Sequence, residues 1–157
     1  DVFDEQFPNR ANAFQFDTDT RNIFICADSK RLLSAFLELL SNAAEADNSC
    51  GSIQIHSHVN ACGHTVTVSV TGKGSLSEIN PSEMQTNPLI DADAPLTAQL
   101  STPFFSTKEN HAGLGLSIVA QVCHTHHAGF ELYSRNGFTT AGITFPILAM
   151  DDMRNTI

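Results

Sequence analysis

The amino-acid sequence predicts an α+β fold, a two-layer α/β sandwich in which helices cover one face of a mixed, mostly antiparallel sheet. Two observations support this prediction. Two segments have the apolar periodicity of helices, and two pairs of short segments alternate apolar and polar residues as hairpins do. Their order is strand, helix, hairpin, a long aperiodic segment, helix and hairpin. The length of 157 residues suits one hydrophobic core, so we expect a single domain over residues 1–157.

The amino-terminal part, residues 1–20, is expected to be a linker or an edge strand, since Phe14 and Phe16 give its one sign of alternation. A short apolar run follows at residues 23–27. Asp28 then has the chemistry of an N-cap, and the segment SKRLLSAFLELLSNAAEA after it repeats apolar residues at helical spacing. The predicted buried stripe of this helix consists of Leu32, Leu33, Phe36, Leu39, Leu40 and Ala43.

Two alternating segments, residues 52–59 and 64–70, predict an antiparallel hairpin with one buried face. Residues 130–134 and 142–148 predict two further strands, which an Asn-Gly turn connects. Each hairpin follows one of the two predicted helices. This arrangement is typical of a sheet that is covered by helices on one side.

The segment between the two halves, residues 74–112, has no sustained periodicity and contains four of the six prolines. An aperiodic stretch of this length in a compact domain is typical of a long flexible lid over a site, with a disordered insert as the alternative. Helical periodicity resumes at Gly113. The predicted buried face of this second helix consists of Ile118, Val119, Val122 and Cys123.

The charge balance argues against binding of nucleic acid, because 17 acidic residues against 8 Lys and Arg give a formal net charge of −9. No apolar stretch reaches membrane-spanning length, so no direct membrane contact is expected. The four cysteines form no CxxC pair, which favours buried thiols in the cytoplasm, and a membrane anchor in a longer parent protein remains open. The histidines in residues 124–127 suit a helix end better than a metal site.

Several polar and glycine positions have patterns that suit a ligand. Glu38, Asn42 and Glu45 share one helix face and could bind a cation or its waters, although a solvated polar face would look the same. Gly72 and Gly74 follow a strand, where they would either admit a ligand to the backbone or form a tight turn.

A second group of residues lies around the start of the second helix. Gly113 and Gly115 open that helix, so its free N–H groups could hold a phosphate, or the glycines could form a hinge. Before them, PFFSTK (residues 103–108) combines two aromatic residues that could plug the core with Lys108, a cation within reach of the same amides.

Together these segments resemble the ATP-binding catalytic domain of bacterial sensor histidine kinases, which share a superfamily with gyrase, the heat-shock chaperone ATPases and the mismatch-repair ATPases. ELLSNAAEA is similar to the family's N box, TGKG to its first glycine box, PFFSTK to its F box and GLGLSIV to its second glycine box. The NAAEA and PFFSTK variants are most similar to nitrogen-regulation-type sensor kinases. The resemblance covers roughly residues 20–148 and implies a Bergerat-type ATP-binding fold.

The resemblance also implies roles for individual residues. ATP and Mg²⁺ would be the cofactors, with Asn42 coordinating Mg²⁺ and Glu38 holding a metal-bound water or polarising an attacking one. Residues 74–112 would be the ATP lid. The implied nucleotide-binding positions are Asn42, Glu45, Val70, Gly72, Gly74, Lys108, Gly113, Leu114, Gly115 and Leu116. Phosphoryl transfer would proceed by positioning and charge neutralisation.

This sequence departs from the family pattern at two points. The phosphoacceptor histidine motif is absent, so the expected partners are a dimerisation and phosphoacceptor domain of the same kinase outside this chain, and a response regulator. Val70 stands where the family has an aspartate that binds the adenine amino group. Loss of that hydrogen bond costs about 1.5–3 kcal/mol, or roughly 10- to 100-fold in affinity.

Three explanations of Val70 remain open: natural degeneration, an introduced substitution, or an adenine contact rerouted through water or Thr71. The sequence favours a kinase catalytic domain with weakened nucleotide binding. Two other functions remain as alternatives. One is a non-catalytic regulatory module that binds a kinase or response regulator, and the other is a stand-alone ATPase that uses Glu38 as its base.

Overall fold

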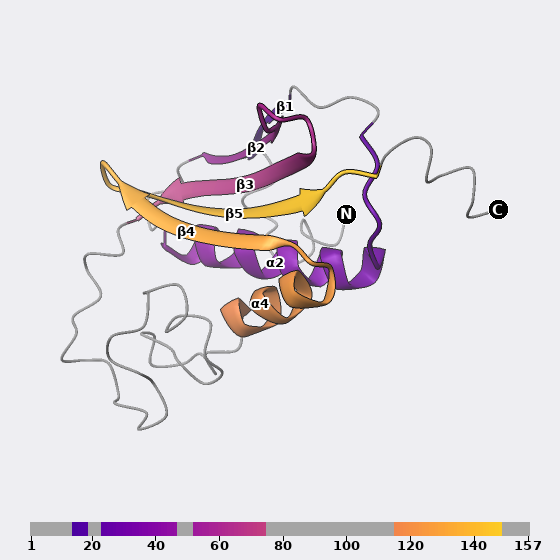
Figure 1. Cartoon of the computed structure of the whole chain (residues 1–157). Coiled ribbons are helices and arrows are strands. Elements are labelled where there is room, and N and C mark those ends of the chain that lie inside the picture. The colour runs from indigo at the N-terminus through magenta and orange to yellow at the C-terminus, as the bar shows by residue number, and fades with distance from the viewer. Residues whose placement is uncertain (1–13, 19–22, 47–51, 75–114, 149–157) are drawn as a thin grey trace, which may run out of the picture.

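The computed structural model describes residues 14–18, 23–46, 52–74 and 115–148, which form a five-stranded sheet with two helices on one of its faces (Figure 1). The elements are β1 (Phe14–Thr18), α2 (Ser29–Ala46), β2 (Ile53–Val59), β3 (Thr65–Lys73), α4 (Gly115–Thr125), β4 (Gly129–Arg135) and β5 (Phe138–Pro146). This confirms the predicted sandwich. Of the predicted lid, only Gly74 lies within the described residues.

The strand order is β1-β2-β3-β5-β4, and β1 pairs parallel with β2 while the other three pairings are antiparallel. Parallel neighbours need a long crossover connection, and α2 lies between β1 and β2 in the chain. The two hairpins β2–β3 and β4–β5 meet where β3 pairs with β5. The sheet is therefore mixed and mostly antiparallel, as predicted.

The core lies between the sheet and the helices. On the central strand β3, Val66 and Val70 face the helices and are buried, and Val70 is only 2 % exposed. The register places Val70 between Ile55 of β2 and Ala141 of β5. The other buried apolar residues of the core are Ala35, Leu39 and Ala44 of α2, Ile53 of β2, Val119, Val122 and Cys123 of α4, and Ala141, Ile143 and Phe145 of β5.

The bounds of α2 agree with the predicted segment, and Asp28 caps it as expected, since Asp28 Oδ1 accepts hydrogen bonds from the backbone N–H groups of Lys30 (2.9 Å) and Arg31 (3.2 Å). Two residues of the predicted apolar faces were assigned wrongly. Leu33 is 51 % exposed and Ile118 is 37 % exposed. Ile118 lies about 100° around α4 from the buried Val119, and Leu33 lies about 100° around α2 from the partly buried Leu32, so the apolar stripes are narrower than the sequence pattern.

Residues 23–27 do not form a strand, although they are apolar. They run beside the end of β5, where Leu148 N–H donates to the Phe24 carbonyl at 2.8 Å, and Ile23 and Ile25 pack against the core. Residues 14–18 form the edge strand β1, one of the two alternatives expected for residues 1–20. β5 begins at Phe138, earlier than predicted, because it pairs with the full length of β3.

The end of β3 differs from the expected glycine loop. The strand continues through Lys73, so Gly72 is a strand residue paired with Thr139. A Cβ built on Gly72 would lie 2.9 Å from the Ala43 Cβ and 3.3 Å from the Ala43 Cα and carbonyl oxygen. Gly72 therefore lets α2 approach the sheet closely, and the hypothesis of a tight turn at this residue is wrong.

We expect Gly72→Ala to lower the free energy of unfolding by about 1–3 kcal/mol, because the new methyl group would meet helix backbone that cannot rotate away. Urea denaturation of the chain would measure the change. Gly129→Ala is the matched control, since a Cβ there would be 3.8 Å from the Thr144 Cβ, an ordinary contact. Equal stability of the two variants would contradict the proposed packing role.

Candidate functional site

The middle of α2 and the first residue of α4 lie together and form the candidate site. A Cβ built on Gly115 would lie 2.7 Å from Glu38 Oε2 and 3.6 Å from Asn42 Nδ2. At the other end of α4, the His126 ring contacts Asp28 at the start of α2. The two helices therefore run antiparallel, and the amino-terminal end of α4 points to the polar face of α2.

The position of Gly115 gives this site its electrostatic character. The first N–H groups of a helix have no partner within the helix, and that end carries roughly half a positive charge. The Glu38 carboxylate lies directly beside it, and both Glu38 and Asn42 are partly exposed to solvent. The site thus combines oxygen atoms that can bind a metal ion with a positive helix end that offers N–H groups for hydrogen bonds.

Glu45, the third residue of the predicted polar face, lies less than one turn beyond Asn42 on α2. One of its carboxylate oxygens, Oε1, accepts a hydrogen bond from Ser41 Oγ at 3.1 Å. This contact within the helix orients the carboxylate. Glu45 therefore borders the site made by Glu38 and Asn42 and already has a partner of its own.

The predicted positions on β3 lie under the second half of α2. Val70 is part of the core, and Gly74, with φ of +145°, donates its N–H to the Gly137 carbonyl at 2.9 Å. The Gly74 carbonyl in turn accepts a bond from Thr139 Oγ1 at 3.0 Å. These bonds tie the end of β3 to the β4–β5 hairpin and keep Gly74 next to Ala46, the last residue of α2.

Thr71 lies on the other face of the sheet. Its hydroxyl pairs with the Thr140 hydroxyl at 2.8 Å, and successive strand residues point to opposite faces, so this side chain points away from Val70. The geometry gives no support to the idea that the Thr71 hydroxyl takes over an adenine contact. The explanations of Val70 that do not involve Thr71 stay open.

Three predicted site residues, Lys108, Gly113 and Leu114, lie outside the described residues. Leu116, by contrast, lies in the first turn of α4 and packs against the core. Among the residues that are described, no group of three or more His, Cys, Asp or Glu side chains could hold a metal ion. The donors Glu38 and Asn42 suit Mg²⁺, which needs only one or two protein oxygens when phosphates supply others.

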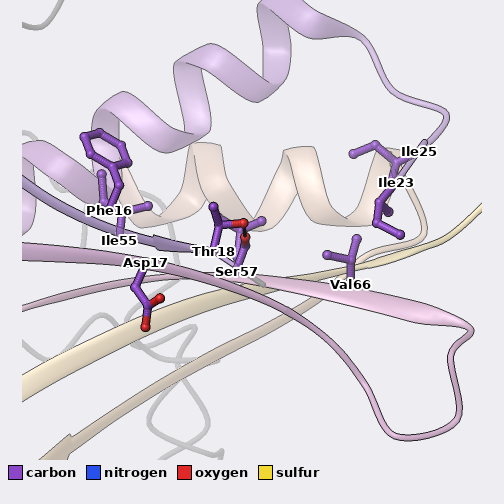
Figure 2. Close-up of a pocket in the computed structure, with 9 residues that line it drawn as sticks. Phe16, Asp17, Thr18, Ile23, Ile25, Ile55, Ser57 and Val66 are labelled. Atoms are coloured by element: carbon purple, nitrogen blue, oxygen red, sulfur yellow. Dashed lines mark hydrogen bonds between the residues drawn. The ribbon is translucent and has the colours of Figure 1, made fainter. Parts of the chain in front are cut away.

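An apolar cavity of about 320 Å³ lies elsewhere, between β1, β2 and the segment before α2 (Figure 2). Phe16, which is 75 % exposed, stands at its rim, and Ile23 and Ile25 form its other wall. Neither Glu38 nor Asn42 lines it. We assign it no part in the chemistry of the site.

Comparison with known proteins identifies the family of the chain. The family model described as histidine kinase-, DNA gyrase B-, and HSP90-like ATPase matches residues 27–149, which is most of the chain. The chain belongs to this family. No helix in the part of the chain that the structure describes is long and apolar enough to cross a membrane.

Similar proteins are sensor kinases. The sensory histidine kinase/phosphatase NtrB of Rhizobium leguminosarum bv. phaseoli is 33 % identical over 127 residues, which are 78 % of this chain and 32 % of NtrB. NtrB of Rhodobacter capsulatus is 28 % identical over 120 residues, 76 % of this chain and 33 % of that protein. This chain therefore spans about a third of the length of these relatives.

A solved structure, the nucleotide-free catalytic domain of the histidine kinase ThkA, matches with a TM-score of 0.68 and 26 % identity. The match covers 92 % of this chain and 85 % of that one. The fold expected from the resemblance to sensor kinases is confirmed.

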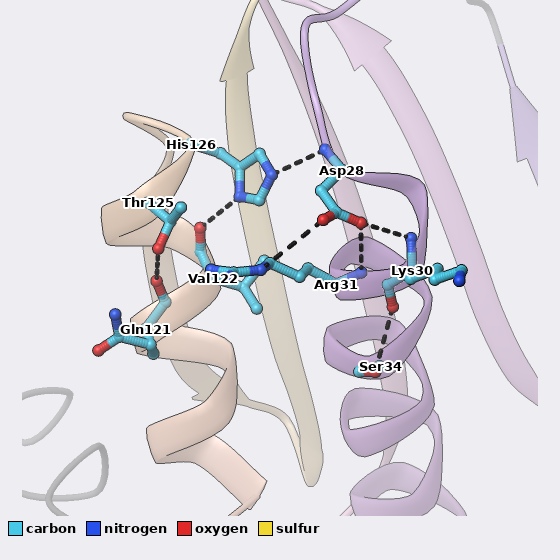
Figure 3. A network of polar contacts seen from close by, with 8 residues as sticks. All are labelled: Asp28, Lys30, Arg31, Ser34, Gln121, Val122, Thr125 and His126. Atoms are coloured by element: carbon cyan, nitrogen blue, oxygen red, sulfur yellow. Dashed lines mark hydrogen bonds and ion pairs between the residues drawn. The ribbon is translucent and has the colours of Figure 1, made fainter.

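One polar contact that joins the two helices has no signal in the sequence. His126 lies between the carboxy-terminal end of α4 and the start of α2 (Figure 3). The sequence suggested only that a histidine in a last turn suits the helix dipole. Its partner, Asp28, is 98 residues away in the chain, so no local pattern signals the contact.

Proposed function

We propose that this chain is the ATP-binding catalytic domain of a two-component sensor histidine kinase. It transfers the γ-phosphoryl group of ATP to a histidine on a dimerisation domain outside the chain. One observation carries the proposal: the amino-terminal end of α4 at Gly115 lies on the oxygen donors Glu38 and Asn42. The family membership and the similarity to NtrB support it.

Each residue of the site has a role in this proposal. The N–H groups at the start of α4 bind the phosphate oxygens, because the first N–H groups of a helix have no acceptor within that helix and lie at its positive end. Asn42 and Glu38 hold the magnesium ion, Asn42 directly and Glu38 through water. When bound, the ion supplies neutralisation of phosphate charge. These residues accelerate transfer by orienting the phosphates and by stabilising charge rather than by covalent chemistry.

The nucleotide affinity of this domain is reduced by Val70, which offers adenine no hydrogen-bond acceptor. Val70 is 2 % exposed and packed with apolar neighbours. Losing a hydrogen bond to a charged acceptor weakens binding by roughly 10- to 100-fold. In this proposal the part of the site that binds adenine binds it weakly, while the part that binds the phosphates retains its N–H donors.

Calorimetric titration of the chain with Mg²⁺ and a non-hydrolysable ATP analogue tests the proposal. We expect weak, Mg²⁺-dependent binding of the analogue. In a separate assay with ATP, we expect phosphoryl transfer to a dimerisation domain of a related kinase that is added to the chain. No nucleotide binding under any condition would favour the regulatory module. Phosphate release by the chain alone that Glu38→Gln abolishes would favour the stand-alone ATPase.

Gly115→Ala separates the chemical role of this residue from any role in stability. The new methyl group would clash only with the flexible end of Glu38 and would make an ordinary contact with Asn42 Nδ2, so we expect the free energy of unfolding to change by less than about 1 kcal/mol. Displacement of the Glu38 carboxylate should lower the rate of phosphoryl transfer by about tenfold or more. An unchanged transfer rate in the folded variant would show that Glu38 does not need its observed position.

A further inference from the structure

His126 joins the ends of the two helices through both of its ring nitrogens (Figure 3). The backbone N–H of Asp28 donates to Nε2 at 2.9 Å, and Nδ1 lies 2.7 Å from the Val122 carbonyl oxygen. Because Nε2 accepts a bond, it carries no proton. The proton is therefore on Nδ1, which donates to Val122, and the ring is the neutral Nδ1–H tautomer.

This contact lies at the end of α4 opposite to the candidate site. Gly115 and His126 are eleven residues apart, roughly 16 Å along a helix. At one end α4 contacts Glu38, and at the other His126 holds the cap residue of α2. Asp28 also caps α2 with its carboxylate, so the hydrogen bond that its N–H donates to His126 Nε2 fixes α4 to the point where α2 begins.

We propose that His126 is a positioning residue of the nucleotide site: its neutral ring fixes α4 along α2 and so keeps Gly115 on Glu38, and protonation of the ring releases α4. The positioning role rests on the function proposed above. A proton on Nε2 would face the Asp28 N–H, and two donors cannot bond each other. Nucleotide binding by the domain therefore becomes sensitive to acid.

The charged groups around the ring decide whether protonation breaks the contact. Asp28, directly before α2, contacts the ring, Lys30 and Arg31 follow in the first turn of α2, and His124 and His127 are near His126 in the sequence. The Asp28 carboxylate could hold a protonated ring, but it already caps two N–H groups and lies 3.7 Å from Arg31 Nε.

Burial raises the pKa of the Cys123 thiol to about 11, so this neighbour is neutral throughout the range in which histidine titrates. Breaking the contact with the Asp28 N–H is the expected outcome, because Nε2 and that backbone nitrogen would then both be donors.

NMR spectroscopy of the whole chain, without nucleotide, tests whether the His126–Asp28 contact positions Gly115. On acidification from about pH 8 to about pH 6, across the histidine range, the amide signals of Asp28 and Gly115 should shift together. His126→Gln, which keeps a neutral acceptor at about the position of Nε2, should abolish both shifts. His124→Gln is the matched control and should leave them unchanged. A pH-dependent shift of the Asp28 amide signal without any shift of the Gly115 amide signal would overturn the proposal.

Binding of Mg²⁺ and a non-hydrolysable ATP analogue gives the second readout. The parent chain should bind about fivefold more weakly at about pH 6 than His126→Gln does, the effect expected for one net hydrogen bond. At about pH 8 the two should bind equally, and His126→Ala should bind weakly at both. Protonation of the phosphates affects all variants alike, so only the difference between them counts.

The outcomes distinguish this proposal from the function on which it rests. Equal pH dependence in the parent chain and His126→Gln overturns the positioning role and leaves the kinase assignment intact. If no variant binds nucleotide, the kinase proposal fails. The NMR shifts of the Asp28 and Gly115 amides alone then decide whether the His126–Asp28 contact positions α4 along α2. If His126→Ala does not fold, the comparison with His126→Gln still decides the question.

Discussion

Asn42→Ala is expected to lower the rate of phosphoryl transfer to a dimerisation domain by about 100-fold or more, the effect of removing one well-placed electrostatic contact. The Asn42 amide lies one helical turn from Glu38 and next to the start of α4. It is the proposed direct ligand of Mg²⁺, so its loss removes both metal binding and orientation of the phosphates. Transfer of radiolabelled phosphate would measure the effect.

The stability of Asn42→Ala should not fall, because alanine has the higher helix propensity and Asn42 is partly exposed. Gln121→Ala is the matched control, since it removes an exposed side-chain amide from α4 that lies away from Glu38. This control should transfer phosphate at the parent rate. Full activity of Asn42→Ala, or an equal loss in Gln121→Ala, would remove Asn42 from the proposed site.

Val70→Asp is expected to have two opposite effects. Without nucleotide it should lower the free energy of unfolding by about 3 kcal/mol or more, because it places a carboxylate among the apolar residues of the core. With nucleotide it should tighten binding by roughly 10- to 100-fold, because the adenine amino group gains a charged acceptor. Thermal unfolding and calorimetric titration of the same sample would measure both.

The pH dependence of Val70→Asp has a definite sign. Burial disfavours the ionised form, so it raises the pKa of the new carboxyl above its unfolded value. The destabilisation is then largest at neutral pH and shrinks as the pH falls and the group becomes neutral. Val70→Thr is the control, since it has nearly the same shape and no charge. It should cost less stability and leave the nucleotide affinity unchanged.

Destabilisation of Val70→Asp without any gain in affinity would show that adenine does not reach this side chain. The reduced affinity of the parent chain would then need another cause. A gain in affinity without destabilisation would show instead that the Val70 position opens to solvent in solution. Either result would change the proposed role of Val70, and neither depends on the metal side of the site.

Local pattern alone predicted the elements that have strong periodicity. The bounds of α2, the Asp28 cap and both hairpins follow from spacing and from residue chemistry within a few positions. The family and the pairing of Glu38 with Asn42 on one helix face were also accessible from the sequence, because ordered motifs and a one-turn separation do not depend on distant contacts.

Only the tertiary structure decided which of these patterns meet. Gly72 serves the close approach of α2 and is part of a strand, because Ala43 lies directly over it. The width of each buried stripe, which leaves Leu33 and Ile118 exposed, depends on how the two helices share the sheet. The contact of Gly115 with Glu38 and that of His126 with Asp28 join residues far apart in the chain. Contacts of that kind come from packing of the whole core, and no local propensity encodes them.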